Sequence, residues 1–208
     1  MFFCSRKIAM ENLLAAIDST IPGEMISSLM KVYRELDEKQ SRFQHDFHVS
    51  CIEGCGECCL HYVPVLTQAE ALVAAYVIIR DKKEDQVLSR LNGSDPNSPV
   101  CPFYNKEGGY HCSLYEGRSM VCRLFGFSCS ENKEHELVWR SCKWKSGNKE
   151  EIAYDDLKAN RVDVPVMSEY GERLEECSDI EGESIYSAIP KAIWKLKMIL
   201  EMTENTSA

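Results

Sequence analysis

The run Cys51-Ile-Glu-Gly-Cys55-Gly-Glu-Cys58-Cys59 holds four of the eleven cysteines in this 208-residue chain. Nine of the eleven lie in one central region, from Cys51 to Cys142. Thiols this close oxidise and pair with one another unless something binds them, so a dense set indicates a shared ligand or a disulfide framework. The odd total fits a fully paired framework poorly.

The composition indicates a globular protein in a reducing compartment. Hydrophobic residues make up 44% of the chain, enough for a buried core. No apolar run reaches the roughly 18 residues needed to span a bilayer. The N-terminal stretch from Met1 to Lys7 lacks the apolar segment of a secretory signal. We therefore expect a cytoplasmic protein, in which clustered cysteines are metal-binding or catalytic.

The net charge disfavours nucleic-acid binding. It is −9 at pH 7, with a pI near 5.1, whereas phosphate backbones need clustered basic side chains. We read the one local basic stretch as a solvated loop carrying two core tryptophans. We expect neither a nucleic-acid nor a membrane partner, and a protein partner stays open. The residues of that stretch are Trp139, Arg140, Lys143, Trp144, Lys145 and Lys149.

Apolar periodicity predicts helices on both sides of the cysteines. In the first half, a helical pattern through Ile17 stops at Pro22, and a longer helix runs from about Met25 to His48. Thr67 and Glu70 form a capping box that opens a helix through about Arg80. Further helices are predicted at 80–91, 150–158, 166–176 and 184–202, the last one kinked or broken at Pro190.

The centre shows little periodicity. From Val100 to Lys145, short apolar pairs alternate with cysteines and glycines, as expected where ligands rather than a large core fix the backbone. We therefore predict a mainly α fold, a small helical domain around an irregular cysteine-rich metal-binding centre. Its parts are N-terminal helices (1–48), a cysteine-cluster domain (49–145) and C-terminal helices (146–208) that pack on the same core.

The cysteine spacing suggests ligands. Cys55-Gly-Glu-Cys58 has the knuckle spacing whose tight turn aims two sulfurs at one cation. Cys58 and Cys59 are adjacent and point opposite ways in an extended chain, so one is spare or two sites lie back to back. We predict Cys142 as a ligand ahead of Cys129, because it completes an even number. The predicted ligands are Cys51, Cys55, Cys58, Cys59, Cys101, Cys112, Cys122 and Cys142.

The remaining candidates lie near these thiols. Arg118 and Arg123 flank Cys122 and are predicted to balance its charge or hold an anionic ligand, and pairing with Glu107 or Glu116 is the structural alternative. Two histidines near the cysteines are expected to hydrogen-bond to a sulfur or a carbonyl rather than coordinate metal. Isolated cysteines are expected to be spare. The two histidines are His61 and His111, and the two isolated cysteines are Cys4 and Cys177.

Several motifs in order resemble a known family. The runs CIEGCGECC, CPFY, CSLY and RSMVCRLF are similar to the cysteine-cluster proteins named for the motif CxxCxxCC, zinc- or iron-chelating proteins whose small bacterial representatives are YkgJ-like. The resemblance covers residues 48–130. It departs from the family at the three-residue spacing after Cys51 and at Ser119, where proline is usual. The matching positions are Cys55, Gly56, Cys58, Cys59, Cys101, Cys112, Tyr115, Arg118, Cys122, Arg123 and Phe125.

The resemblance implies a metal but no established activity. A related motif occurs in flagellin lysine-N-methylases, which resemble iron–sulfur proteins that use S-adenosylmethionine. Those chains are considerably longer, and no glycine-rich nucleotide turn follows a strand in this sequence. An all-thiolate set selects either zinc or an iron–sulfur cluster such as [4Fe–4S], and spacing alone does not separate them.

Three classes of function follow from such a site. In the first, the metal is structural and the helices present a surface to a protein partner. In the second, the chain is an iron–sulfur oxidoreductase, electron carrier or methyltransferase-related enzyme. In the third, it is a metal chaperone or sensor. No catalytic triad or phosphate loop supports a particular reaction. The sequence therefore predicts a metal-binding cysteine-cluster protein and leaves enzymatic activity undecided.

Overall fold

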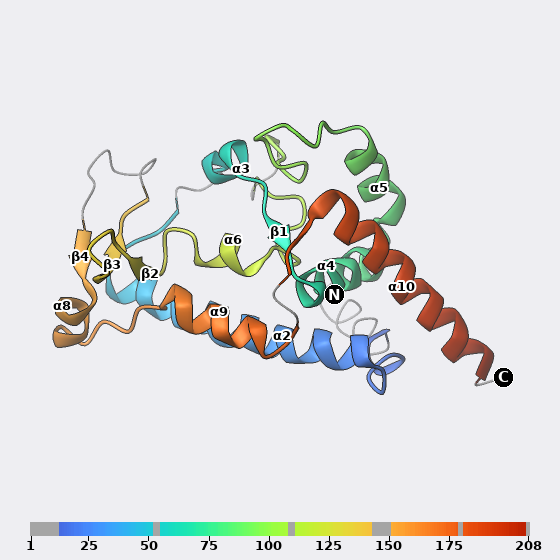
Figure 1. The fold of residues 1–208 in the computed structure, drawn as a ribbon, viewed down its shortest axis with the longest axis horizontal. Coiled ribbons are helices and arrows are strands. Elements are labelled where there is room, and N and C mark those ends of the chain that lie inside the picture. Colours follow the sequence, from blue (N-terminus) through green and yellow to red (C-terminus); the bar gives the residue numbers. More distant parts are fainter. Residues whose placement is uncertain (1–12, 52–54, 108–110, 143–150, 179–180, 207–208) are drawn as a thin grey trace, which may run out of the picture.

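The computed structural model describes residues 13–51, 55–107, 111–142, 151–178 and 181–206 (Figure 1). It is 54% helical with 10% strand, which confirms the mainly α prediction. The helices are α2 (Ile21–Asp46), α3 (Glu57–His61), α4 (Gln68–Arg80), α5 (Glu84–Asn92), α6 (Met120–Leu124), α8 (Tyr154–Ala159), α9 (Met167–Glu175) and α10 (Ile185–Thr206). The strands are β1 (Val65–Leu66), β2 (Cys129–Glu131), β3 (Leu137–Arg140), β4 (Glu151–Ala153) and β5 (Glu183–Ser184).

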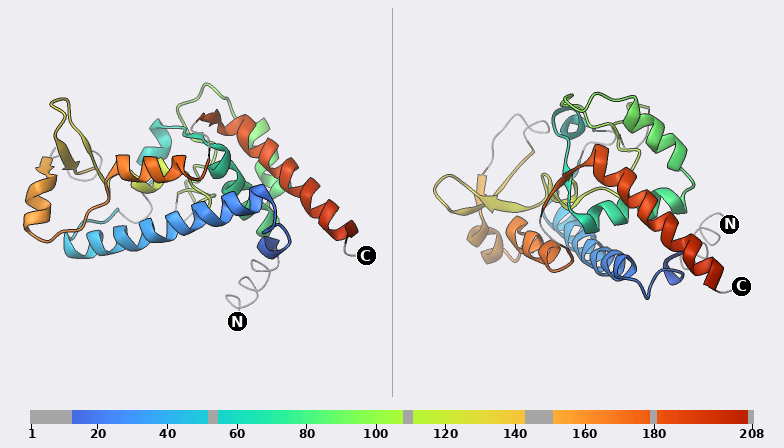
Figure 2. Two further views of the ribbon diagram at one scale, coloured as in Figure 1. Left: turned by 60° about the horizontal axis from the view of Figure 1, so that its bottom comes forward. Right: turned by 45° about the vertical axis from the view of Figure 1, so that its right-hand side comes forward.

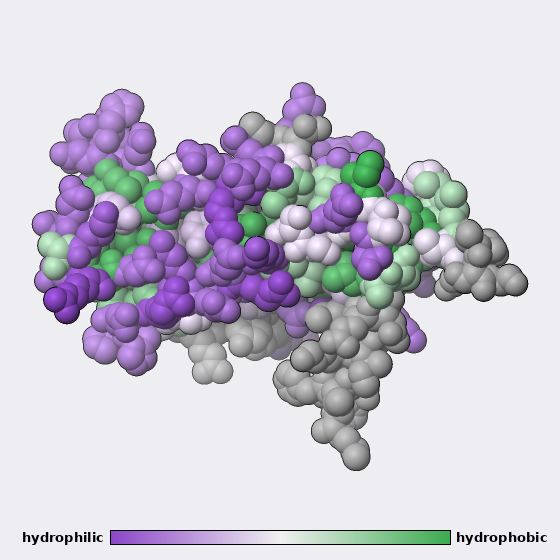
Figure 3. All heavy atoms as spheres, turned by 90° about the horizontal axis from the view of Figure 1, so that it is seen from below, coloured by the Kyte–Doolittle hydropathy of each residue, from purple (hydrophilic) through white to green (hydrophobic). Residues whose placement is uncertain are grey.

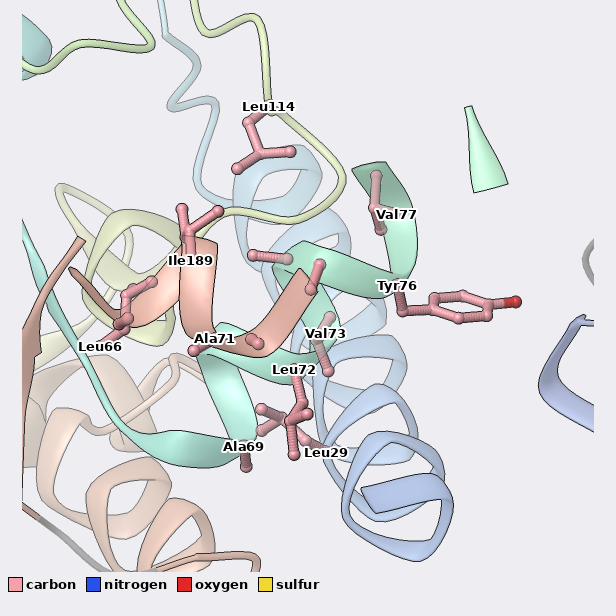
Figure 4. Packing of buried hydrophobic residues seen from close by; sticks show 14 of the residues in the cluster. Leu29, Leu66, Ala69, Ala71, Leu72, Val73, Tyr76, Val77, Leu114 and Ile189 are labelled. Atoms are coloured by element: carbon pink, nitrogen blue, oxygen red, sulfur yellow. The ribbon is translucent and has the colours of Figure 1, made fainter. Parts of the chain in front are cut away.

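The main core surrounds α4, which packs against α2 on one side and α10 on the other (Figure 2). Most of α4 is buried, because small alanines let neighbouring helices approach while larger side chains fill the space between them. Figure 4 shows Leu72 and Val73 of α4 with Leu29 of α2 and Ile189 of α10 in this cluster. Seen from below, the left and centre of the surface are mostly hydrophilic, and hydrophobic residues are more frequent at the right (Figure 3). None of the described helices is long and apolar enough to cross a membrane.

A second hydrophobic cluster lies at the far end of α2. Strands β2, β3 and β4 form an antiparallel sheet in that order, drawn at the left of Figure 1. Trp139 of β3 is buried and packs edge-on against Phe43 and Phe47, with ring centroids 5.8 and 5.2 Å away. Trp139 is therefore a core residue, as predicted. Cys129 is wholly buried in the same cluster.

Helix boundaries agree with the sequence in some places and differ in others. The capping box is present, with Thr67 Oγ1 accepting from the Glu70 N–H and the Glu70 carboxylate accepting from the Thr67 N–H. Residues 13–15 are helical and residues 16–20 are not, so the predicted break between two helices is present. Pro22 itself lies in the first turn of α2, where proline needs no N–H partner. Helix α10 continues through Pro190, against the predicted break.

The largest difference is the sheet. Residues 129–140 were predicted to be irregular, and residues 150–153 to be helical, yet they form β2, β3 and β4. Each strand is only three or four residues long, too short to show a clear alternation of apolar and polar residues. Of the N-terminal helical pattern, Ile8 lies outside the described residues, as do Cys4, Lys143, Trp144, Lys145 and Lys149.

Glu70 joins α4 to the segment that carries Cys122. One oxygen of its buried carboxylate accepts from the Thr67 N–H and the other from the Met120 N–H, both at 2.8 Å. Burial raises the pKa of Glu70, and these hydrogen bonds oppose the rise. The carboxylate therefore satisfies two N–H groups that no helical bond reaches.

Replacing Glu70 by Ala is expected to lower the free energy of unfolding by about 2–4 kcal/mol, because two buried N–H groups lose their acceptor. Urea unfolding measures the change. Glu38→Ala is the matched control, because Glu38 is an exposed residue in the middle of α2. Equal changes in the free energy of unfolding for the two substitutions would show that the hydrogen bonds accepted by the Glu70 carboxylate do not stabilise the fold.

Candidate metal centre

All eight predicted ligand cysteines line a single cavity of about 940 Å³. Its walls come from α3, α6, the loop between α5 and α6, the first turns of α10, and the residues after β3. Cys129 and Cys177 do not line it. Among the described His, Cys, Asp and Glu side chains, no three are placed to hold one metal ion together. Ligation by these cysteines therefore stays a prediction, while their gathering around one cavity is a feature of the structure.

Backbone contacts bring the two cysteine clusters together. The Cys101 N–H donates to the Cys59 carbonyl at 2.7 Å, which joins segments 42 residues apart in sequence. Gly56 permits this approach, because a Cβ there would lie 2.4 Å from the Tyr104 ring and 2.8 Å from the His111 Cβ. Any larger residue at position 56 would push the two clusters apart.

Four thiols form an inner set: Cys59, Cys101, Cys112 and Cys122. Burial raises the pKa of Cys101 to about 12 and that of Cys122 to about 11, and it also raises the pKa of Cys112. Neighbouring thiols raise these pKa values further. The charge of Cys112, for example, raises the pKa of Cys101, Cys122 and Cys59. Such thiols stay protonated at neutral pH until a cation replaces the proton.

The other four thiols form an outer set: Cys51, Cys55, Cys58 and Cys142. Burial raises the pKa of Cys51, and the charges of Cys55, Cys142 and Cys58 raise it further. Cys142 reaches this set from the end of β3, and a Cβ on Gly126 would lie 3.5 Å from the Cys142 Cβ. Cys51 therefore interacts with the other three outer thiols, but Cys58 also interacts with Cys59, Cys101, Cys112 and Cys122, so the two sets adjoin each other.

Cys58 lies between the two sets. Its sulfur is 4.0 Å from that of Cys59, and a hydrogen bond from the Cys59 thiol lowers the pKa of Cys58 to about 6. Burial opposes this shift, while the positive charge of Arg118 adds to it. The same interaction raises the pKa of Cys59, because Cys59 keeps the shared proton.

In the metal-free protein, Cys58 is expected to be alkylated by iodoacetamide before any other cavity cysteine. Its thiolate exists above about pH 6 and is lost as the pH falls through that value, so its rate should drop about tenfold between pH 7 and pH 5. Mass spectrometry of peptides after timed alkylation measures this. Cys122 in the same digest is the internal comparison, and equal rates for Cys58 and Cys122 would contradict the shift.

Arg118 lines the cavity, whereas Arg123 does not. The Arg118 guanidinium stacks over the Tyr115 ring at 3.9 Å from its centroid. Its charge opposes the raised pKa values of Cys112 and Cys122. The charge-balancing or anion-binding role of Arg118 stays a prediction.

Arg123 is buried and occupied by structural contacts. Its Nη1 donates to both carboxylate oxygens of Asp37 at 3.0 and 2.9 Å, and Nη2 donates to the Glu116 carbonyl at 2.6 Å. Its guanidinium also lies 4.0 Å from the centroid of the Tyr33 ring. The alternative partner Glu116 contributes its backbone, while its carboxylate pairs with Arg80. These contacts tie α6 to α2 rather than reach the thiols.

Two histidines stand on the cavity wall as well. The ring of His111 hydrogen-bonds through Nδ1 to the Asn105 carbonyl at 2.8 Å, and Nε2 of His61 lies 3.8 Å from the Glu57 carboxylate. The contact of His111 with a carbonyl fits the predicted supporting role. Sequence reasoning missed the apolar part of the wall. Its residues include Leu66, Met167, Ile185 and Ile189, whose spacing signals only burial in a core.

Residues 50–144 match a family model, CxxCxxCC, described as "Putative zinc- or iron-chelating domain". The resemblance read from residues 48–130 is thereby confirmed, with a longer C-terminal extent that includes Cys142. No curated protein and no solved structure matches the chain.

Proposed function

We propose that this chain, whose residues 50–144 match the CxxCxxCC family model, is a metal-binding protein that holds an iron–sulfur cluster through its inner cysteines. The observation that carries the proposal is the convergence of eight thiols from four separate segments on one cavity. Cys59, Cys101, Cys112 and Cys122 would be the cluster ligands, since a [4Fe–4S] cluster takes four cysteines. When bound, such a cluster supplies one-electron redox chemistry.

No three of the described donors are placed to bind a single metal ion, an arrangement that a four-iron cluster does not require. In a tetrahedral zinc site with Zn–S bonds of about 2.3 Å, neighbouring sulfurs lie about 3.8 Å apart. Cys58 and Cys59 approach this separation, but no third donor among the described residues joins them. A four-iron cluster binds each cysteine to a different iron, so its ligands stand further apart around a common centre.

The second candidate is a structural zinc ion in the outer set. Cys55-Gly-Glu-Cys58 has the knuckle spacing, and Cys51 and Cys142 lie near it in the same cavity. These thiols would have to move closer together to bind one zinc ion, because no three described donors are placed for it. The closed four-cysteine site would then hold the segment after β3 against α3 and leave no open position for catalysis. The two candidates are compatible, because they use different cysteines.

Metal analysis tests the proposal. Protein purified without oxygen is expected to contain iron and labile sulfide in near-equal amounts and to absorb broadly in the visible range. Zinc bound at one ion per chain in addition would support the outer site. A colourless protein with zinc alone would refute the cluster and make the whole centre structural.

A further inference from the structure

Among the described residues, Arg118 lacks the carboxylate partner that other buried or half-buried arginines have. Arg80, Arg123 and Arg173 each pair with a carboxylate. No carboxylate among the described residues lies within ion-pair distance of Arg118, and its buried Nε has no hydrogen-bond partner there. A half-buried guanidinium with an unsatisfied N–H is costly unless an anion completes it.

The orientation of Arg118 suits a planar anion. Tyr115 covers one face of the guanidinium at 3.9 Å, which leaves the donors at its edge to bind in the plane. Those donors form a fork that matches a carboxylate with two parallel hydrogen bonds. Since Arg118 lines the cavity, a ligand reaching it would lie beside the thiols.

The cavity is larger than the thiols and their metal require. Its volume of about 940 Å³ is near the upper end of the range for sites that bind small organic molecules, roughly 300–1,000 Å³. Apolar side chains that keep some exposed surface also line the cavity, among them Val121, Phe125, Phe127 and Met167. An apolar ligand body would be favoured on this wall, because it removes apolar surface from water.

We propose that the cavity also binds an organic carboxylate with an apolar body, its carboxylate on Arg118 and its body against the apolar wall. This inference rests on the proposed function, in that the ligand lies beside a metal-loaded cysteine site. The guanidinium of Arg118 binds the carboxylate, and Val121, Phe125 and Met167 contact the apolar body. An inorganic anion lacks the second contact and is expected to bind weakly.

The test uses radiolabelled octanoate and its uncharged analogue octan-1-ol in equilibrium dialysis against the metal-loaded full chain. The wild type is expected to bind octanoate more tightly than octanol, and inorganic phosphate at matched ionic strength should not displace it. Arg118→Met should weaken octanoate binding by about tenfold or more, because the carboxylate loses a charged hydrogen-bonding partner. The same substitution should leave octanol binding unchanged. Arg42→Met is the matched control, because Arg42 is exposed on α2 and does not line the cavity.

Iron, sulfide and zinc are measured in each sample to separate the two claims. Equal octanoate binding by wild type and Arg118→Met, or no preference over octanol, overturns the ligand proposal. Loss of metal from Arg118→Met also overturns it, because Arg118 would then only balance thiolate charge. Octanoate binding that needs Arg118 in a wild type without metal keeps the ligand site and refutes the metal function. If Arg118→Met does not fold, Arg118→Lys keeps the charge but loses the fork, and it should still weaken octanoate selectively.

Discussion

Replacing Cys122 by Ser is expected to remove the metal bound by the inner set and to destabilise the centre of the protein strongly. Serine keeps the size of the side chain but offers no thiolate, so the four-cysteine set becomes incomplete. Metal binding at such a site contributes to folding on the order of 10 kcal/mol. Metal content per chain and urea unfolding without oxygen measure the two effects.

Two further cysteines provide controls for this substitution. Cys177 is half-buried and outside the cavity, so Cys177→Ser should change neither metal content nor stability noticeably. Cys129 is wholly buried but also outside the cavity, so Cys129→Ser should cost about 1–3 kcal/mol of stability and no metal. If Cys122→Ser kept its full metal content, the inner set would be wrongly assigned.

Replacing Arg123 by Ala is expected to lower the free energy of unfolding by about 2–4 kcal/mol. The substitution leaves the Glu116 carbonyl without its donor and removes the packing on Tyr33. The loss of the Asp37 ion pair itself contributes less, because the Asp37 side chain is 49% exposed and returns to water. The free energy of unfolding of Arg123→Lys should lie between those of the wild type and Arg123→Ala, since lysine keeps the charge but lacks the forked donors of the guanidinium.

The metal content of the Arg123 variant separates a structural role from a cofactor-binding one. Folded Arg123→Ala protein is expected to carry as much metal as the wild type, because Arg123 contacts α2 and not the thiols. Loss of metal with unchanged unfolding would show instead that this arginine acts on the metal site, as the sequence suggested.

Sequence reasoning succeeded where the signal was local. The capping box at Thr67 and Glu70 predicts the start of α4, and Asn92-Gly93 predicts the end of α5. The ligand candidates were also recognisable, because cysteine type and spacing are local properties. Each of these features depends on residues within a few positions of one another.

Contacts between distant segments could not be read from the sequence. Asp37 and Arg123 are 86 residues apart, and nothing near Arg123 indicates an acidic partner on α2. The hydrogen bond from the Cys101 N–H to the Cys59 carbonyl joins α3 to the loop between α5 and α6, and no local pattern near either cysteine indicates it. Trp139 of β3 packs on Phe43 of α2 and on Phe47, the C-cap residue of that helix, and no local pattern reveals these contacts.

X-ray absorption at the iron edge, on the wild type purified without oxygen, would show directly whether the inner cysteines hold an iron–sulfur cluster. We expect iron surrounded by four sulfur atoms, with other iron atoms close by, and loss of this signal in Cys122→Ser. Iron bound mainly to nitrogen or oxygen, or a protein that carries no iron, would contradict it.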